Sequence, residues 1–261
     1  MYLESRIDAG VAYVTLSRPD VRNAFNAQLI ARLHETFETL GGDDRVRAIV
    51  LSGAGKTFCG GADINWMRAS LDLSREENVA DAAALSRMLR AIDRTPKLVI
   101  GRVHGAALGG GAGLAAVCDV VVTSDDTVFG FTETKLGILP AVISPFVLAK
   151  IGYSHARALA LTGERFDARR ALAIGLAHEV VPAAGLDAAV ARISSEIASA
   201  GPTAVACTKA LFATVRERAY DDTLDVTAQA IAQQRTSPEG QDGLRAFLEK
   251  RRPDWSATAS R

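Results

Sequence analysis

Two glycine-rich stretches carry the clearest chemical potential in this sequence. Residues 58–63 read Phe-Cys-Gly-Gly-Ala-Asp and residues 105–114 read Gly-Ala-Ala-Leu-Gly-Gly-Gly-Ala-Gly-Leu, and each follows an apolar run and leads toward a helix. Glycine lets a ligand approach the backbone closely, and two N–H groups that converge on one point make an oxyanion hole. Such a hole would hold the negative charge that forms on a carbonyl oxygen when an acyl thioester becomes an enolate.

The elements that must position these loops alternate between strands and helices. Short runs rich in Val and Ile are typical of strands buried on both faces, and apolar residues at helical spacing predict helices between them. The expected strands are residues 11–16, 46–52, 98–103 and 117–123, and the helical stripes are Leu29, Leu33, Phe37 and Leu40, which stop at Gly41-Gly42, and Val79, Leu85, Leu89 and Ile92, which end before Thr95-Pro96. The pattern predicts an α/β core.

The strand pattern ends at Pro182, and helical patterns follow. We expect helices at residues 186–200, 203–218, 222–234 and 238–250. The predicted organisation is an α/β core with the active site over residues 1–182 and a helical packing or oligomerisation region over residues 183–261.

Composition indicates a cytoplasmic enzyme. The chain has 261 residues, 30 basic and 30 acidic residues and three widely spaced cysteines. A balanced charge argues against a general nucleic-acid or anionic membrane surface, and an odd cysteine count fits reduced thiols better than a disulfide framework. The first residues lack the pattern of a signal peptide, and no apolar run reaches the roughly 20 residues that a membrane span needs.

Further segments extend the pattern of the two glycine-rich stretches. They are residues 18–26 (RPDVRNAFN), Phe129-Gly130 followed by Glu133, and residues 136–140 (LGILP), 161–168 (LTGERFDA) and 237–240 (SPEG). In this order and spacing, the chain resembles the crotonase or enoyl-CoA hydratase/isomerase superfamily over nearly its whole length. The resemblance implies a spiral of strand–strand–helix repeats, followed by a C-terminal helical region that assembles homotrimers, often paired into homohexamers.

The resemblance also implies a role for individual residues. The backbone N–H groups of Ala62 and Gly110 would be the oxyanion donors, with a helix beginning near Gly109 adding its N-terminal partial charge. The carboxylate of Glu133 would be the acid/base, and the apolar residues 136–140 that follow it would raise its pKa. Without the surrounding pattern, the glycines could equally serve close helix–sheet packing, and a lone glutamate is usually a solvated charge.

Gly113 departs from the family pattern. Two-glutamate hydratases of the family carry a glutamate three residues after the oxyanion glycine, and both carboxylates hold the attacking water. A lone Glu133 could hydrate an enoyl-CoA only by handing the same proton across one face, whereas a single carboxylate suffices to move a double bond by carrying a proton from C2 to C4. The reaction class therefore stays open between hydratase and isomerase.

A finer likeness favours hydration. Residues 62–67 (ADINWM) and 139–146 (LPAVISPF) resemble the bacterial methylglutaconyl-CoA hydratase group, in which an absent first glutamate is common. By this likeness, the substrate is a branched or carboxylated 2-enoyl-CoA that becomes a 3-hydroxyacyl-CoA. Trp66 and Met67 would line or gate the acyl pocket, although ordinary packing explains Trp66 equally well. The remaining alternatives are an isomerase and a catalytically idle family member that binds acyl-CoA.

Coenzyme A enters as part of the substrate, so we expect no separate cofactor. The expected substrate-binding residues are Arg22, Ala24, Ala62, Asp63, Ile64, Asn65, Trp66, Gly110 and Gly113. Arg22, Lys56 or the cluster Lys250-Arg251-Arg252 would help with its phosphates, although a terminal basic run is more often a solvated surface. The four histidines, which are His34, His104, His155 and His178, lack metal-ligand spacing, so no metal is expected.

Two other motifs do not match the function that each suggests. Residues 53–57 (GAGKT) imitate a phosphate-binding loop, but position 50 is Val where that motif begins with Gly, and a loop is expected to follow instead of a helix. Residues 152–156 (GYSHA) share four residues with a nucleophile elbow but end in Ala and follow no predicted strand.

Overall fold

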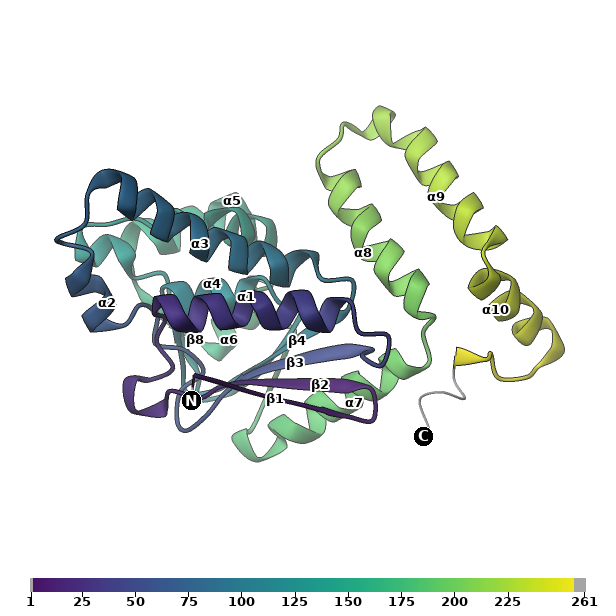
Figure 1. Cartoon of the computed structure of the whole chain (residues 1–261), viewed down its shortest axis with the longest axis horizontal. Helices are drawn as coiled ribbons and strands as arrows, with labels where there is room; N and C mark the ends of the chain where they lie inside the picture. The colour runs from purple at the N-terminus through teal and green to yellow at the C-terminus, as the bar shows by residue number, and fades with distance from the viewer. Residues whose placement is uncertain (1, 256–261) are drawn as a thin grey trace.

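The chain folds into an α/β core, from one side of which its last helices, α8 to α10 (residues 202–249), extend (Figure 1). The computed structural model describes residues 2–255. Its main sheet has six strands in the order β1-β2-β3-β4-β6-β9, of which only β1 is antiparallel to its neighbour. These strands are β1 (Leu3–Asp8), β2 (Val11–Leu16), β3 (Ala48–Gly53), β4 (Leu98–Val103), β6 (Val120–Ser124) and β9 (Glu179–Val181).

A second, smaller sheet carries the loops of interest. It pairs β5 (Ala106–Leu108) in parallel with β7 (Val128–Gly130), which pairs antiparallel with β8 (Arg165–Asp167). The helix α4 (Gly110–Ala116) follows β5, and the short 3-10 helix η2 (Glu133–Leu136) follows β7. Because β5 and β7 are parallel neighbours, the chain leaves both strands at the same edge of this sheet.

Helices α1 (Ala27–Gly41) and α3 (Arg75–Arg94) lie side by side over one face of the main sheet (Figure 1). The predicted stripe of α1 is buried, and the side chain of Asn26 caps this helix by accepting from Leu29 N at 2.9 Å. A capping box of Ser74 and Glu77 starts α3. Of the predicted stripe of α3, Leu89 and Ile92 are buried and Leu85 is partly buried, whereas Val79 is 56 % exposed, so this helix faces the core only toward its C-terminal end.

Helix α7 (Leu186–Ala198) covers the opposite face of the main sheet. Its residues Leu186, Ala189 and Val190 pack against residues of β2, β3, β4 and β6 that alternate with those facing α1. Helix α7, although it follows Pro182, therefore packs as part of the core. The further helices of the core are α2 (Ile64–Ala69), α5 (Ser144–Thr162) and α6 (Ala168–Ala173), and the short 3-10 helices of the chain are η1 (Pro19–Val21), η3 (Ala183–Gly185) and η4 (Tyr220–Thr223).

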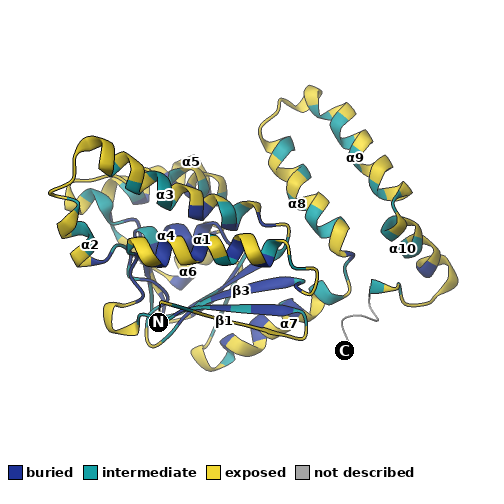
Figure 2. Cartoon of the chain, in the orientation of Figure 1, coloured by how far each residue is buried: buried dark blue, intermediate teal, exposed yellow. Residues whose placement is uncertain are grey.

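The last three helices form an arm that we define as α8 (Pro202–Arg216), α9 (Leu224–Thr236) and α10 (Pro238–Glu249). The arm extends to one side of the core in Figure 1, and Figure 2 shows its surface as mainly exposed. Lys209 in α8 ties the arm to the core through a 2.7 Å ion pair with Asp119. Among residues 2–255, no helix is long and apolar enough to cross a membrane.

The structure also bears on the two competing motifs. Strand β3 ends at Gly53 and the next helix, α2, starts only at Ile64, so no helix follows residues 53–57. Residues 152–156 lie within α5, where Gly152 kinks the helix with a φ of 73°. Neither segment has the strand–loop–helix setting that its motif requires.

Candidate active site

The loop that carries Ala62 pairs with the segment just before α1. Phe25 N donates to Gly61 O at 2.7 Å and Asp63 N donates to Phe25 O at 2.8 Å, in a short parallel bridge between Phe25 and Ala62. Because successive residues of an extended chain present their N–H groups to opposite sides, the Ala62 N–H points away from this bridge. No described residue accepts a hydrogen bond from it.

The N–H of Gly110 is a second free donor. Gly110 is the first residue of α4, so its N–H has no acceptor within the helix, and residues 2–255 offer it no other. Leu108 N donates to Cys59 O at 3.1 Å, which holds β5 against the loop of Ala62. A Cβ at Gly61 would lie 3.9 Å from Gly110 N, so the two donor segments are neighbours.

Phe25 links the two donor segments and was not among the predicted site residues. Its backbone forms the bridge beside Ala62, and a Cβ at Gly110 would lie 3.1 Å from two atoms of its ring. The side chain is 1 % exposed. The only feature of the sequence that pointed to Phe25 was its place within residues 18–26. That pattern does not indicate that one residue contacts both loops.

Glu133 lies beside the start of α4 because β5 and β7 bring them together. Leu108 pairs with Gly130, and Gly109 N donates to Gly130 O at 2.8 Å. A Cβ at Gly109 would lie 3.3 Å from Glu133 Oε1, and Gly109 has a φ of +52°, in the left-handed region that glycine adopts without strain. The glycine before the second donor thus leaves room for the carboxylate.

The Glu133 carboxylate is desolvated, and a backbone hydrogen bond from its own residue compensates this only in part. Its Oε2 atom is buried and makes no hydrogen bond within the described chain. Burial raises the pKa of Glu133 above its ordinary value of 4.5. A buried carboxyl group without a partner is costly to stability, and such groups concentrate at sites that use them.

The source of this burial differs from our expectation. The predicted rise in pKa agrees with the structure, but the apolar residues after Glu133 do not supply it within one chain, because Leu136, Ile138 and Leu139 are 63 %, 53 % and 70 % exposed. Leu136 ends the 3-10 helix η2, and Ile138 and Leu139 follow it in an exposed loop.

Gly113 is buried in α4 and faces Ile143. A Cβ at position 113 would overlap Cγ2 of Ile143 and lie 2.6 Å from its Cβ. Ile143 therefore fills the space that a side chain at position 113 would need. No pattern in the sequence indicates this pairing, because the contact arises between α4 and the start of α5.

The other predicted substrate-binding residues lie around Ala62, but their side chains differ in availability. Ala24 and Asp63 are buried, and Asp63 forms a 2.8 Å ion pair with Arg18 and caps α2 through a 2.8 Å bond from Asn65 N. Ile64 and Asn65 are exposed, and Trp66 is partly buried against the core.

Arg22 and Lys56 are exposed on loops that flank residues 58–63. Gly60 N donates to Arg22 O at 2.8 Å, which keeps that arginine near the glycine loop. In contrast, residues 250–252 follow α10 in the arm, which a single chain places on the opposite side from α2 (Figure 1). There Arg251 pairs with Asp242 at 2.6 Å and with Glu249 at 2.8 Å.

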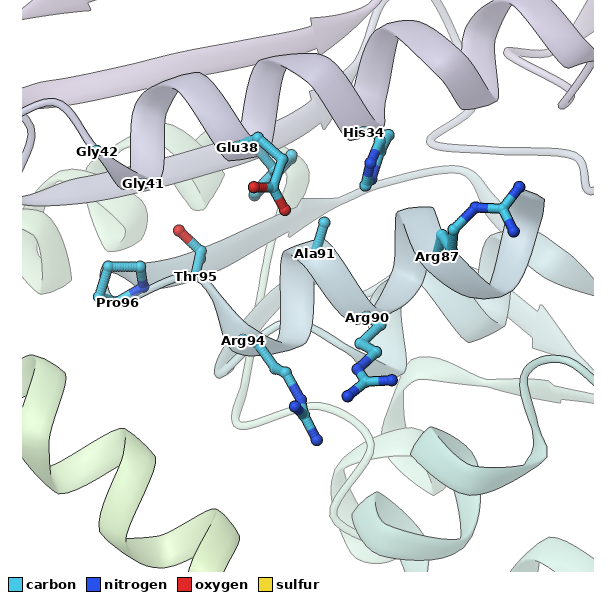
Figure 3. Close-up of a pocket in the computed structure, with 11 residues that line it drawn as sticks. His34, Glu38, Gly41, Gly42, Arg87, Arg90, Ala91, Arg94, Thr95 and Pro96 are labelled. Carbon is cyan, nitrogen blue, oxygen red and sulfur yellow. The ribbon is translucent and has the colours of Figure 1, made fainter. Parts of the chain in front are cut away.

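A separate cavity of about 390 Å³ lies between α1 and α3 (Figure 3). It is lined by residues that include His34, Glu38, Arg90 and Thr95, and by none of the predicted site residues. Both helices end at this cavity, so their C-terminal carbonyl groups act against the positive charge of Arg87, Arg90 and Arg94, which also line it. Within residues 2–255, no group of three or more His, Cys, Asp or Glu side chains could hold a metal ion.

Comparison with known proteins decides the family. The family model described as enoyl-CoA hydratase/isomerase matches residues 6–258. This chain belongs to the crotonase superfamily. An enoyl-CoA hydratase of Alternaria alternata, AKT6-1, is 33 % identical to this crotonase over 94 % of the present chain and 80 % of its own.

Solved structures share the crotonase fold. An enoyl-CoA hydratase from Shewanella pealeana superposes with a TM-score of 0.94 at 38 % identity, covering 98 % of this chain and 96 % of its own. AtuE of Pseudomonas aeruginosa also gives a TM-score of 0.94 at 38 % identity, covering 98 % of this chain and 100 % of its own. The fold predicted from the resemblance is therefore confirmed.

Proposed function

We propose that this crotonase is a hydratase that converts a 2-enoyl-CoA into a 3-hydroxyacyl-CoA. One observation carries the proposal most directly, namely the carboxylate of Glu133, with its Oε2 atom buried and unpartnered, beside two backbone donors that have no acceptor in the described chain. The thioester oxygen would accept from Ala62 N–H and Gly110 N–H, which would stabilise the enolate as it forms.

The proton balance requires only one side chain. The Glu133 carboxylate takes a proton from water as the water oxygen bonds to C3, and the electrons of the double bond move onto the thioester to form the enolate. The protonated Glu133 then returns that proton to C2. The raised pKa of Glu133 suits this exchange because the group must accept and release a proton at the same pH.

The packing of Ile143 against Gly113 bears on the substrate. It leaves one carboxylate to position the water, since a second one cannot be placed at residue 113 without displacing Ile143. We propose a branched or carboxylated enoyl-CoA, such as methylglutaconyl-CoA, whose own polar group helps to hold the water. Arg22, Ala24, Ile64, Asn65 and the backbone of Asp63 would contact coenzyme A. We propose no separate cofactor, since coenzyme A is part of the substrate. We also propose that the protein is located in the reducing cytoplasm.

An isomerase is the second candidate, because a lone carboxylate can carry a proton from C2 to C4. The two activities change the absorbance of the enoyl thioester in opposite directions. Hydration of a 2-enoyl-CoA removes its conjugated absorbance, whereas isomerisation of a 3-enoyl-CoA creates it.

A panel of straight, branched and carboxylated enoyl-CoA thioesters tests the proposal. We expect loss of absorbance, fastest with the branched or carboxylated members. In the Glu133→Gln variant, turnover should fall by roughly 10²–10⁴-fold, the usual range for a general acid/base. A gain of absorbance from 3-enoyl substrates alone would establish the isomerase, and no change with any substrate that the protein nevertheless binds would establish an idle acyl-CoA-binding protein.

We also propose a homotrimer or homohexamer with no nucleic-acid or membrane partner. The arm leaves apolar side chains exposed, with Phe212, Leu224 and Phe247 at 68 %, 72 % and 82 %. A nearly apolar cavity of about 230 Å³ opens between Phe131 and α5 on the core. Exposed apolar areas of this kind mark interaction surfaces.

A further inference from the structure

A buried ion pair involves Asp63, the residue that follows the Ala62 donor. Arg18 Nη2 lies 2.8 Å from Asp63 Oδ2, and the two side chains are only 14 % and 6 % exposed. Burial acts to raise the pKa of Asp63, but hydrogen bonds from Arg18 and from the backbone of Asn65 lower it below its ordinary value. Taking both charges out of water is costly, so a pair of this kind is weak support for stability alone.

The Arg18 guanidinium bridges two loops that are distant in sequence. Its Nη1 donates to the carbonyl oxygen of Ala24, and its Nη2 binds Asp63. The second oxygen of Asp63 accepts from Asn65 N at 2.8 Å at the start of α2. One side chain thereby fastens the segment before α1 to the segment that follows Ala62.

The Ala62 donor lies between these attachments. The bridge between Phe25 and Ala62 is short, with one backbone bond on each side of Ala62, from Phe25 N to Gly61 O and from Asp63 N to Phe25 O. The other backbone bonds of this loop, at Cys59 and Gly60, all precede Ala62, so on the side of Asp63 the direction of the free N–H depends on the Phe25 bond and on what holds Asp63. An oxyanion donor must be held in its productive direction before reaction, because its catalytic value comes from preorganisation.

We propose that Arg18 is a positioning residue of the oxyanion hole, which holds the Ala62 N–H toward the thioester oxygen by joining the Ala24 carbonyl to Asp63. This inference rests on the proposed function in one respect, that the free N–H groups bind a thioester. Arginine suits the task because its planar fork reaches two acceptors at once, whereas lysine carries a single nitrogen.

The test uses Arg18→Met, Arg18→Lys and Asp63→Asn in the full chain, with Arg170→Met as a matched control. Arg170 also forms an arginine–carboxylate pair, at 2.6 Å from Glu164, but this pair is half-exposed and has no contact with the donor loops. We expect the three test variants to lose about 10–100-fold in kcat, as for a donor misplaced by about 1 Å. KM should change far less, and the control should match the wild type.

A second measurement reports on the hydrogen bonds from the two donors without turnover. It is the carbonyl stretching frequency of bound butyryl-CoA that is labelled with carbon-13 at the thioester carbon. Hydrogen bonds to the carbonyl oxygen lower this frequency. The wild type should show a lowered frequency, and Arg18→Met and Arg18→Lys should shift it back toward that of the free thioester. Combining Arg18→Met with Asp63→Asn should add little to either change, because both remove one bridge.

Several results would overturn the inference. Arg18 would be merely structural if Arg18→Met lowered the melting temperature while turnover and the carbonyl frequency stayed at wild-type values. If Arg18→Met does not fold, a wild-type frequency in Arg18→Lys would reject the positioning role in the same way. A wild type that lowers the frequency without turning over any enoyl-CoA would reject the hydratase but leave the role of Arg18 testable, whereas a wild type that lowers no frequency would reject the oxyanion hole itself.

Discussion

Catalysis and stability make opposite demands on Glu133. Its Oε2 atom is buried without a hydrogen bond, so the charged form that would take a proton from water is unfavourable in the folded chain. The folded-state pKa lies above the unfolded value of about 4.5, so the folded state binds more protons between these two values. The wild type therefore loses stability as the pH rises through that window and does not regain it above.

Glu133→Gln should remove this loss. Glutamine does not titrate, so the variant should be more stable than the wild type at neutral pH, and the gain should shrink as the pH falls toward 4.5 and below. Urea unfolding followed at several pH values measures the difference. A variant less stable than the wild type at neutral pH would show that the carboxylate has a stabilising partner.

Gly113 and Ile143 form a pair that should respond jointly to mutation. Gly113→Glu alone should lower activity and stability, because its Cβ would overlap Ile143. Adding Ile143→Gly removes that overlap and should recover folding, with crotonyl-CoA hydration above that of Ile143→Gly alone. Steady-state rates of the wild type, the two single variants and the double variant measure the coupling. Additive effects would show that the two positions are independent.

At the scale of elements, the sequence predicted some strands and missed others for identifiable reasons. Strand β4 has the predicted bounds because Val and Ile are buried there on both faces. The run from residue 117 is a strand only from Val120, since Val117 closes α4 and an apolar run alone does not separate a helix end from a strand start. The missed β5, β7, β8 and β9 have three residues each, too few for a period, and the six-residue β1 was missed because it is mostly exposed and carries no run of apolar residues.

The candidate site was predictable only in part, because a local sequence pattern does not encode contacts between elements. The glycine stretches and Glu133 stand out by residue type and by resemblance, and the structure brings them together. Phe25, Ile143 and Arg18 act through contacts between elements that no local pattern encodes. Helix α7 was likewise grouped with the arm, although its apolar residues gather on one face more clearly than those of α8 and α9, and its packing on the sheet separates it from them.

Helix α8 contributes an ion pair to the attachment of the arm. Lys209 Nζ binds Asp119 at 2.7 Å and Lys97 O at 3.3 Å, with little exposure of either charged side chain. Lys209→Met should destabilise the docked arm by about 1–3 kcal/mol. Hydrogen exchange should then quicken in α8–α10 but not in β3. Arg32→Met, which removes an exposed pair with Glu35, is the control, and unchanged exchange in the arm would assign its docking to other contacts.

At the scale of the whole molecule, the exposed arm predicts association. Helices α8 and α9 contain no buried residue, although they carry Phe212, Leu224 and Ile231. Light scattering should give about three or six times the 27.6 kDa of one chain. Phe212→Ser should weaken the assembly by removing apolar area. A particle of single-chain mass at micromolar concentration would reject the trimer and the hexamer together.

The glycines at positions 109 to 111 and 113 lead to an expectation for saturation mutagenesis. All four positions should tolerate few replacements. The second-site substitutions that restore function to a replaced glycine should differ between positions. A side chain at 113 meets the side chain of Ile143, and one at 110 meets the ring of Phe25, so a smaller residue at the opposing position can relieve either. At 111 the obstacle is the backbone carbonyl of Cys59, which no substitution removes. Second-site revertants should therefore be recoverable for position 113 and absent for position 111.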